Sequence, residues 1–330
     1  MAVTKLKVKF LFIMLTYMLC ILCLLTMIGA RSVLIRIFLE MTQPGVYFRQ
    51  HSKGTDAREA TLVTAYFEIN SKHTHGEYDG WIRNMLSLTD PMVIFTEEKF
   101  VEKFLGLRLH ALNKTQSITT SFDDVKIAKM FSRDAWTQQL LMDREMALHK
   151  SYYLFWIWLN RLSWMTEAIK ANPFDTDICV WCDIGSLRGH TYNSDRLVRN
   201  LDMISNDKML IMASGPPHDV ENGVENGDVT NKFDGIFRNR DWYTAGAVLA
   251  GYKHTVVAME AMFLQTIQEC HAHGLFIGDD QSLLQSTCVQ NNICEFVTPY
   301  HVQGDKWFGL HYALHTDNVI SLWKPTIIPS

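Results

Sequence analysis

The stretch Ile178-Cys179-Val180-Trp181-Cys182-Asp183-Ile184-Gly185-Ser186-Leu187-Arg188 decides the fold of this chain. It begins as a run of apolar and β-branched residues, which is typical of a strand buried on both faces. The run ends abruptly at a carboxylate and a glycine turn, Asp183-Ile184-Gly185. In an open α/β sheet, ligands bind outside the carboxyl ends of the central strands, and the sequence places Asp183 there. An isolated Asp-x-Gly also fits a simple turn or a helix cap, so the rest of the chain must decide between the two readings.

The segments before this stretch alternate between strand and helix patterns. Strands are predicted over residues 61–67 and 91–96, and each is followed by a predicted helix, the first over residues 78–88. Residues 132–169 are also helical and rich in aromatic side chains; we interpret them as helices packed on the sheet rather than as a platform for sugars. This order predicts an α/β fold with a mostly parallel sheet flanked by helices.

Composition limits the classes of partner. The chain has 330 residues and a net charge of −4, from 31 basic and 35 acidic residues. A nucleic-acid-binding domain usually carries a strong excess of basic residues, so no nucleic-acid partner is expected. The length suits one large domain or two small ones.

The N-terminal region has the pattern of a membrane anchor. Residues 10–28 form an uncharged, largely apolar run of 19 residues, which is long enough to span a bilayer. Basic residues before the run favour a cytoplasmic N-terminus. We therefore expect a cytoplasmic tail (1–9), a transmembrane signal anchor (10–29), a stem (30–58) and a globular domain (59–330), as in a single-pass type II membrane protein of the Golgi or another secretory-pathway membrane, with its globular domain in the lumen. The alternative is a cleaved signal peptide and a secreted structural protein.

The seven cysteines do not indicate a disulfide scaffold. Cys179-x-x-Cys182 has redox or zinc spacing, but residues three apart on a strand point to opposite faces. We therefore expect both to be core residues. Cys288 and Cys294 are close enough in sequence to form a small loop disulfide.

Three later segments carry candidate site residues. Gly246 lies in Tyr243-Thr244-Ala245-Gly246, where a glycine allows close approach of backbone to a ligand or simply turns the chain. In Gly278-Asp279-Asp280-Gln281, the two acids suit either a helix N-cap or contact with sugar hydroxyls and general-base chemistry. His301-Val302-Gln303-Gly304-Asp305-Lys306-Trp307 offers a metal ligand, a close-approach glycine and a phosphate partner, although such combinations also arise by chance.

Taken in order, the four segments resemble the metal-dependent glycosyltransferases of the GT-A fold, of the glycogenin-like type. Asp183-Ile184-Gly185 stands where that pattern has Asp-x-Asp, so its second acid is absent here. Asp280-Gln281 matches, whereas the segment at His301 is one residue short and lacks the proline. More specifically, the chain resembles the HtrL (YibB) family of glycosyltransferase-like proteins over roughly residues 60 to 310.

The resemblance implies a membrane-anchored glycosyltransferase that moves a sugar from a nucleotide-sugar donor to a glycan or glycoconjugate acceptor. It implies Mn²⁺ or Mg²⁺ held by Asp183 and His301, with Asp280 and Gln281 as the catalytic pair. Donor contacts are expected from residues of several segments: Thr64, Tyr66, Gly185, Gly246, Gly304 and Lys306. Because the second acid is missing, the alternative is a GT-A-like protein that binds glycans or nucleotide sugars without turnover.

Overall fold

A computed structural model describes residues 59–70, 73–188, 195–213, 244–297 and 308–315, together with the backbone of 46–49 and 320–323. The chain divides into two units, residues 1–47 and 48–330, and the following description concerns the second. The predicted tail and anchor lie outside the described residues. Within the described ranges, no helix is both long enough and apolar enough to cross a membrane.

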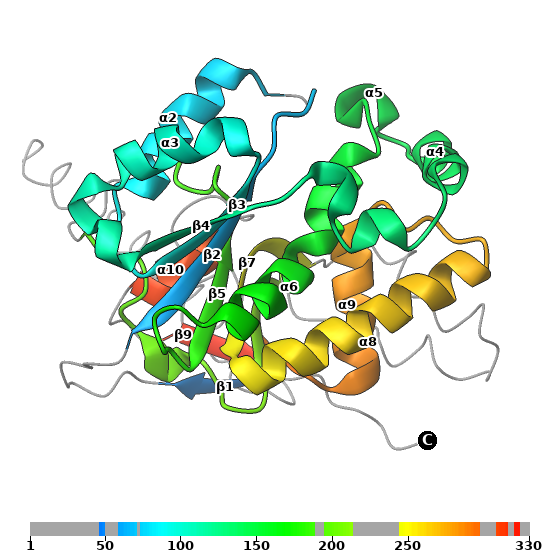
Figure 1. Cartoon of the computed structure of the whole chain (residues 1–330). Helices are drawn as coiled ribbons and strands as arrows, with labels where there is room; N and C mark the ends of the chain where they lie inside the picture. Colours follow the sequence, from blue (N-terminus) through cyan, green and yellow to red (C-terminus); the bar gives the residue numbers. More distant parts are fainter. Residues whose placement is uncertain are drawn as a thin grey trace, which may run out of the picture. The chain divides into compact units, whose positions relative to one another are not determined.

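The centre of the fold is a nine-stranded sheet in the order β1-β9-β8-β6-β7-β5-β2-β3-β4, counted over the part of the chain that is described (Figure 1). Its strands are β1 (Val46–Arg49), β2 (Ala60–Tyr66), β3 (Met92–Thr96), β4 (Thr115–Thr119), β5 (Ile178–Cys182), β6 (Met209–Ala213), β7 (Thr244–Tyr252), β8 (Cys294–Val297) and β9 (Ile320–Trp323). The predicted strands at 61–67, 91–96 and 178–182 are therefore confirmed.

Most strands of the sheet run in the same direction. β2 pairs in parallel with β3 and β5, and β3 with β4, whereas β7 lies antiparallel between β5 and β6. Successive crossovers move from β2 to β3 to β4, and the chain then returns to place β5 on the other side of β2. The strand order thus reverses between β2 and β5, which is the position where open α/β sheets form ligand crevices.

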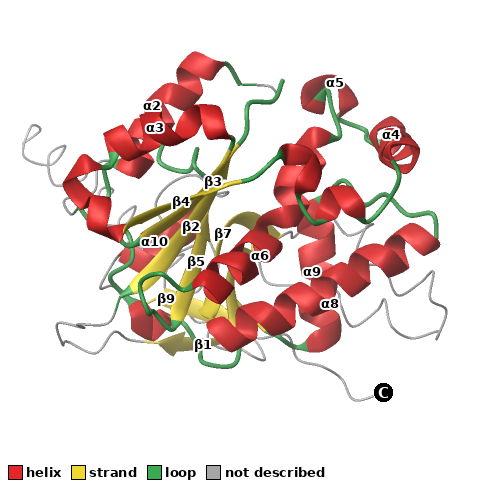
Figure 2. Ribbon diagram, viewed as in Figure 1, coloured by secondary structure: helices red, strands yellow, loops and turns green. Residues whose placement is uncertain are grey.

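Helices cover both faces of the sheet, as Figure 2 shows in red. The α-helices are α2 (His75–Leu86), α3 (Glu98–Leu107), α4 (Arg133–Met142), α5 (Met146–His149), α6 (Tyr153–Ala171), α8 (Lys253–Ala272), α9 (Asp280–Asn291) and α10 (Gly309–His315), and the 3₁₀ turns are η1 (Leu109–Lys114), η2 (Phe122–Asp124), η3 (Ile127–Lys129) and η4 (Leu201–Met203). The long helices α6 and α8 lie side by side across one face (Figure 1). Because β-strand crossovers are right-handed, the reversal of strand order places α2 and α3 on the opposite face.

The start of α2 follows from a capping box. The Thr74 side chain accepts a hydrogen bond from the backbone N–H of Glu77, and the Glu77 carboxylate accepts one from the backbone N–H of Thr74 (2.7 Å). Two of the otherwise unpaired N–H groups at the helix start are satisfied in this way. The helix then buries Ile82, Met85 and Leu86 and carries the half-buried Trp81 toward the end of β5.

The core beneath the site is built from stacked aromatic rings. Trp164 of α6 stacks on Trp181 of β5 (5.6 Å between ring centroids) and on Phe95 of β3 (6.0 Å). All three side chains are almost completely buried. The prediction of core packing is confirmed for Trp136, Phe155, Trp156 and Trp164, which are buried, whereas Tyr152, Tyr153 and Trp158 are half-buried. The Trp164–Trp181 contact joins α6 to β5.

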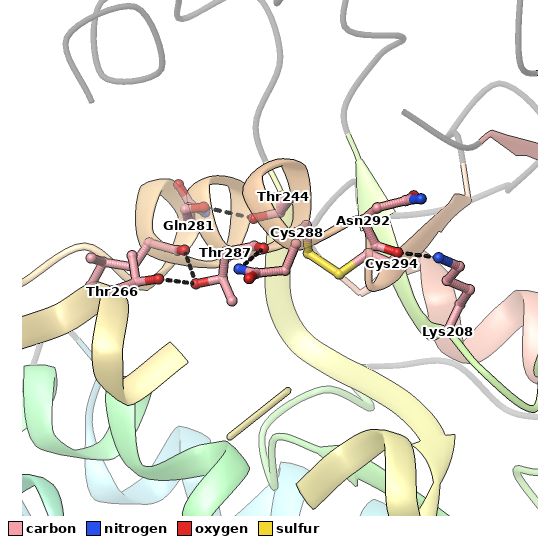
Figure 3. The surroundings of a disulfide bond; sticks show 10 residues. Lys208, Thr244, Thr266, Gln281, Thr287, Cys288, Asn292 and Cys294 are labelled. Atoms are coloured by element: carbon pink, nitrogen blue, oxygen red, sulfur yellow. Dashed lines mark hydrogen bonds between the residues drawn. A yellow bond between two sulfur atoms is a disulfide. The ribbon is translucent and has the colours of Figure 1, made fainter. Parts of the chain in front are cut away.

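Cys179 and Cys182 are free and buried, as their strand spacing predicts. Burial raises the pKa of both thiols, so neither is a reactive thiolate at neutral pH. Cys288 and Cys294 form a disulfide with a Cα–Cα distance of 5.2 Å, which confirms the predicted loop disulfide. Figure 3 shows that it links the end of α9 to the start of β8, next to Asn292, whose carbonyl accepts a hydrogen bond from Lys208.

The disulfide closes a short loop, and the length of this loop determines how much the bond adds to the free energy of unfolding. The loop-closure relation gives about 2 kcal/mol for a loop of this size. We expect a reductant to lower the free energy of unfolding of the native chain by about 2 kcal/mol, measured by urea unfolding. A Cys288→Ala/Cys294→Ala variant should not respond to reductant, whereas Cys270→Ala should respond like the native chain. If the double variant and Cys270→Ala responded equally to reductant, the Cys288–Cys294 disulfide would be contradicted.

Candidate functional site

Asp183 lies immediately beyond β5, at the carboxyl edge of the sheet. Its backbone N–H donates to the carbonyl of Ala247 on β7 (2.8 Å), which extends the strand pairing by one residue. Its carbonyl accepts a hydrogen bond from the N–H of Ser186 (2.8 Å), which closes a tight turn. Asp183 is thus fixed at the switch point of the sheet, where the sequence predicts it.

The Asp183 carboxylate is held by three N–H donors from two residues. Trp181 is two residues away and points to the same face, so its indole N–H donates to Asp183 Oδ1 (2.7 Å). On the same face, Arg161 of α6 binds the carboxylate in a two-point fork, from Nε to Oδ1 (3.0 Å) and from Nη2 to Oδ2 (2.8 Å). Such paired bonds are the strongest form of arginine–carboxylate contact.

Arg161 also binds a second carboxylate. Its Nη1 donates to Oδ2 of Asp280, the first residue of α9. We call Arg161, Asp183 and Asp280 the Arg161 cluster. The side chains of Arg161 and Asp280 are 5% and 8% exposed, whereas that of Asp183 is 26% exposed. Asp183 is therefore the member of the cluster that a ligand can reach.

One guanidinium between two ionised carboxylates leaves the cluster with a net negative charge. Burial lowers the pKa of Arg161, but Asp183 and Asp280 outweigh this effect and raise it above its ordinary value. Burial raises the pKa of Asp280 to about 6, since it outweighs the attraction of Arg161, and repulsion from Asp279 and Asp183 acts in the same direction. Asp280 is thus the cluster member whose charge changes near neutral pH.

Gly246 makes room for the cluster. The sequence predicts Gly246 in a turn before a strand, but the residue lies within β7 itself. A Cβ added here would collide with Asp280 Oδ2 and would lie 2.5 Å from Arg161 Nη1. The close approach that Gly246 permits within the described residues is therefore to the Arg161–Asp280 pair, and its predicted contact with the donor stays a prediction.

The two adjacent acids at the start of α9 have different roles. Asp279 is the N-cap: its carboxylate accepts from the N–H of Gln281 (3.1 Å) and from the hydroxyl of Ser282 (2.6 Å). Asp280 points into the Arg161 cluster. Gln281 is bound through its main chain, because its carbonyl accepts from the Thr244 hydroxyl (2.7 Å), a bond visible in Figure 3. The sequence offers two explanations for this segment, and both apply: Asp279 caps the helix, and Asp280 belongs to the Arg161 cluster.

Gly185 is required by packing. A Cβ at this position would lie 3.2 Å from Cε3 of Trp81, which is tighter than almost all real contacts of this kind. The residue that stands in place of the second acid of Asp-x-Asp therefore faces an indole ring. A side chain here would require the Trp81 ring to shift by a few tenths of an ångström.

The two predicted donor contacts on β2 are enclosed by protein. Thr64 is completely buried. Tyr66 is 9% exposed, and its ring packs edge-on against Tyr78, Phe100 and Phe104. Burial, with smaller effects from Glu68 and other neighbours, raises the pKa of Tyr66 to about 12. Neither side chain offers a surface to a nucleotide, because the strand is covered on both faces by helices.

The sequence predicts Asp183 and His301 as metal ligands. His301, Gly304 and Lys306 lie outside the described residues. Asp183 Oδ1 already accepts two N–H groups and Oδ2 accepts one. Within the described ranges, no three His, Cys, Asp or Glu side chains are grouped to hold a metal ion. Of the two predicted ligands only Asp183 is described, and its carboxylate is engaged by Arg161 and Trp181, so the Mn²⁺ or Mg²⁺ site stays a prediction.

Arg161 is the site residue that sequence reasoning missed. It lies in a helix that is apolar on nearly all sides, with Leu159 and Leu162 among its buried neighbours. A helix of that kind is buried, and a buried arginine requires a carboxylate partner. A charge in the middle of the apolar, buried part of this helix was the available signal. The sequence does not show its partners, because they lie 22 and 119 residues away.

Gly246→Ala should destabilise the protein by about 1–3 kcal/mol, because overpacking a filled site forces neighbours to move. The comparison is urea unfolding against Gly106→Ala, whose added Cβ meets nothing within 4 Å. That control sits in helix α3 and should be neutral or slightly stabilising. If Gly246→Ala and Gly106→Ala changed the free energy of unfolding equally, the proposal that Gly246 leaves space for the Arg161 cluster would be wrong.

The raised pKa of Asp280 predicts a pH dependence of stability. Between about pH 4 and pH 6 the unfolded chain loses this proton before the folded chain does, so stability falls as pH rises. The shift from 3.8 to about 6 corresponds to about 3 kcal/mol. Relative to Asp280→Asn, the native chain should lose about this free energy of unfolding between pH 4 and pH 7. The exposed Asp134→Asn variant should follow the native curve; parallel curves for native and Asp280→Asn would refute the assignment.

Comparison with known proteins identifies the family but no activity. The model of a family described as bacterial protein of unknown function, HtrL_YibB, matches residues 58–315. No curated protein matches the chain. Since the family is described as bacterial, the predicted localisation as a type II protein of the Golgi, with a lumenal domain, is wrong: that organelle belongs to eukaryotic cells. The match covers more than half of the sequence, so the chain belongs to the HtrL_YibB family.

Proposed function

We propose that this chain is a glycosyltransferase that moves a sugar from a nucleotide-sugar donor to a hydroxyl group of a glycan or glycoconjugate. The observation that carries the proposal is the partly exposed carboxylate of Asp183 at the switch point of a mostly parallel sheet. Ligands of open α/β sheets bind at this position. A GT-A-like architecture is consistent with this sheet, with helices on both faces and the candidate site at the carboxyl edge.

The proposed chemistry is displacement at the anomeric carbon of the donor sugar. The acceptor oxygen forms a bond to this carbon while the bond to the phosphate oxygen breaks, and its electron pair leaves with the diphosphate. The acceptor proton passes to Asp183, whose Oδ2 accepts only one hydrogen bond from the described residues. A positioned carboxylate of this kind typically contributes about 100- to 10,000-fold to the rate.

Asp280 has a different role in this proposal. It lies behind Arg161 and is 8% exposed, so the base role predicted for it would require the acceptor to reach a nearly buried side chain. We assign Asp280 the positioning of the Arg161 guanidinium, which in turn orients Asp183. Metal assistance by Asp183 and His301 stays a prediction, because His301 lies outside the described residues.

A binding protein without turnover is the second candidate. The observation in its favour is that Arg161 pairs with both carboxylates of the cluster, so neither is an uncommitted base. Such a protein would recognise a nucleotide sugar or glycan at the same edge of the sheet without breaking the donor bond.

Turnover distinguishes the two. The purified chain, incubated with a panel of uridine, guanosine, adenosine and cytidine nucleotide sugars with and without Mn²⁺, should release free nucleotide. Asp183→Asn should lower that rate by at least about 100-fold, while Asp134→Asn, an exposed acid on α4, should not. Full activity of Asp183→Asn would contradict the proposal that Asp183 accepts the acceptor's proton. Binding of donors without release on any acceptor would favour the second candidate.

A further inference from the structure

Arg188 is an exposed arginine that the turn after Asp183 holds in a fixed orientation. Its guanidinium carbon lies 4.2 Å from the ring centroid of Trp81 and 4.7 Å from that of Phe308. Its Nε donates to the carbonyl of Gly185 (3.0 Å). Arginine stacked on aromatic rings retains its charge and its terminal donors, and within the described ranges no hydrogen bond engages Nη1 or Nη2 of Arg188.

The support around Arg188 comes from two other elements. Trp81 lies on α2 and packs against Gly185 as well as Arg188. Asn84, one helical turn further along α2, donates to the carbonyl of Leu187 (2.8 Å). Phe308, which is buried, immediately precedes α10. The guanidinium is therefore ordered before any ligand arrives, which reduces the entropy lost on binding.

Among the described residues, no carboxylate pairs with Arg188. Within the described part of the chain, Arg188 forms no ion pair, whereas Arg161 is bound by two acids and Arg133 by Asp123. The neighbouring Arg161 cluster has a net negative charge. A phosphorylated ligand at this edge would be repelled unless a cation compensated it, and Arg188 is a cation of the protein in the turn that follows Asp183.

We propose that Arg188 binds the phosphate groups of the donor and neutralises the departing diphosphate in place of a divalent cation. The inference rests on the proposed function, since it names the phosphate subsite of the same site. Guanidinium groups bind phosphate oxygens through paired hydrogen bonds, which matches the two nitrogens that the Gly185 contact leaves available. The simpler explanation is an arginine whose stem and head only cover Trp81.

The test measures nucleotide affinity in the absence of metal. Uridine diphosphate, guanosine diphosphate and inorganic pyrophosphate are titrated into the native chain by calorimetry, in EDTA and in Mn²⁺. We expect at least one to bind in EDTA and Arg188→Gln to weaken that binding about 10- to 100-fold. Arg83→Gln removes an exposed arginine from the same helix as Trp81 and should bind like the native chain. The affinity of uridine or guanosine, which carry no phosphate, should not change in Arg188→Gln.

The other outcomes separate this inference from the proposed function. Equal affinity of native chain and Arg188→Gln, or binding that requires Mn²⁺, would overturn the role of Arg188 and leave glycosyl transfer intact. Failure of every phosphorylated probe to bind, with or without Mn²⁺, would overturn both. Equal weakening of nucleoside and nucleoside diphosphate would indicate a packing role and also reject the inference.

A conservative variant covers the case in which Arg188→Gln does not fold. Arg188→Lys keeps the positive charge and the stem over Trp81 but loses the planar fork. It should fold, as judged by its unfolding midpoint, and bind pyrophosphate more weakly than the native chain and more tightly than any folded neutral variant. Native-like affinity of Arg188→Lys would show that charge alone suffices at this position and would reject the paired hydrogen bonds.

Discussion

The structure depends on one buried arginine held between two carboxylates. A charged group inside a protein costs several kcal/mol unless it is paired with good geometry. Arg161 meets this requirement only because Asp183 and Asp280 reach it from two different elements, the end of β5 and the start of α9. The cluster therefore joins α6, β5 and α9 at one edge of the sheet, and β7 can pass beside it because Gly246 has no side chain. Loss of Arg161 would leave two carboxylates without their cation, whereas loss of either acid leaves one ion pair in place.

The same cluster decides which chemistry is available at this edge. Because Arg161 engages both acids, the site is a pre-organised carboxylate with partial exposure rather than an open pair of metal ligands. Its residual negative charge repels phosphate, so a diphosphate-bearing ligand requires a cation from elsewhere. The adjacent turn supplies one in Arg188, fixed by two aromatic rings.

The features that were predicted correctly from the sequence are those that depend on residues close together in the chain. The apolar run of β5 and its end at Asp183 are local, so they were predicted correctly. The order of short motifs along the chain was enough to identify the family. Arg161 was missed because its partners are remote in sequence. Gly246 was misread because nothing local shows that β7 runs antiparallel between β5 and β6, with Gly246 inside the strand. The predicted organelle was wrong because an apolar run shows only whether a segment can span a bilayer. Its length carries no information about which kind of cell contains the protein.

The absence of a second acid and the presence of a bound arginine follow from a single packing arrangement. A side chain at position 185 would begin 3.2 Å from Trp81, so an aspartate there would have to extend into space that the indole fills. With glycine at this position, Trp81 lies flush against the turn and presents its ring to Arg188 at 4.2 Å. An acid at this position would require Trp81 to shift by a few tenths of an ångström. The position that the resemblance assigns to a metal-bound carboxylate is thus occupied by an indole and a guanidinium, and a negatively charged ligand approaching it meets a cation of the protein itself.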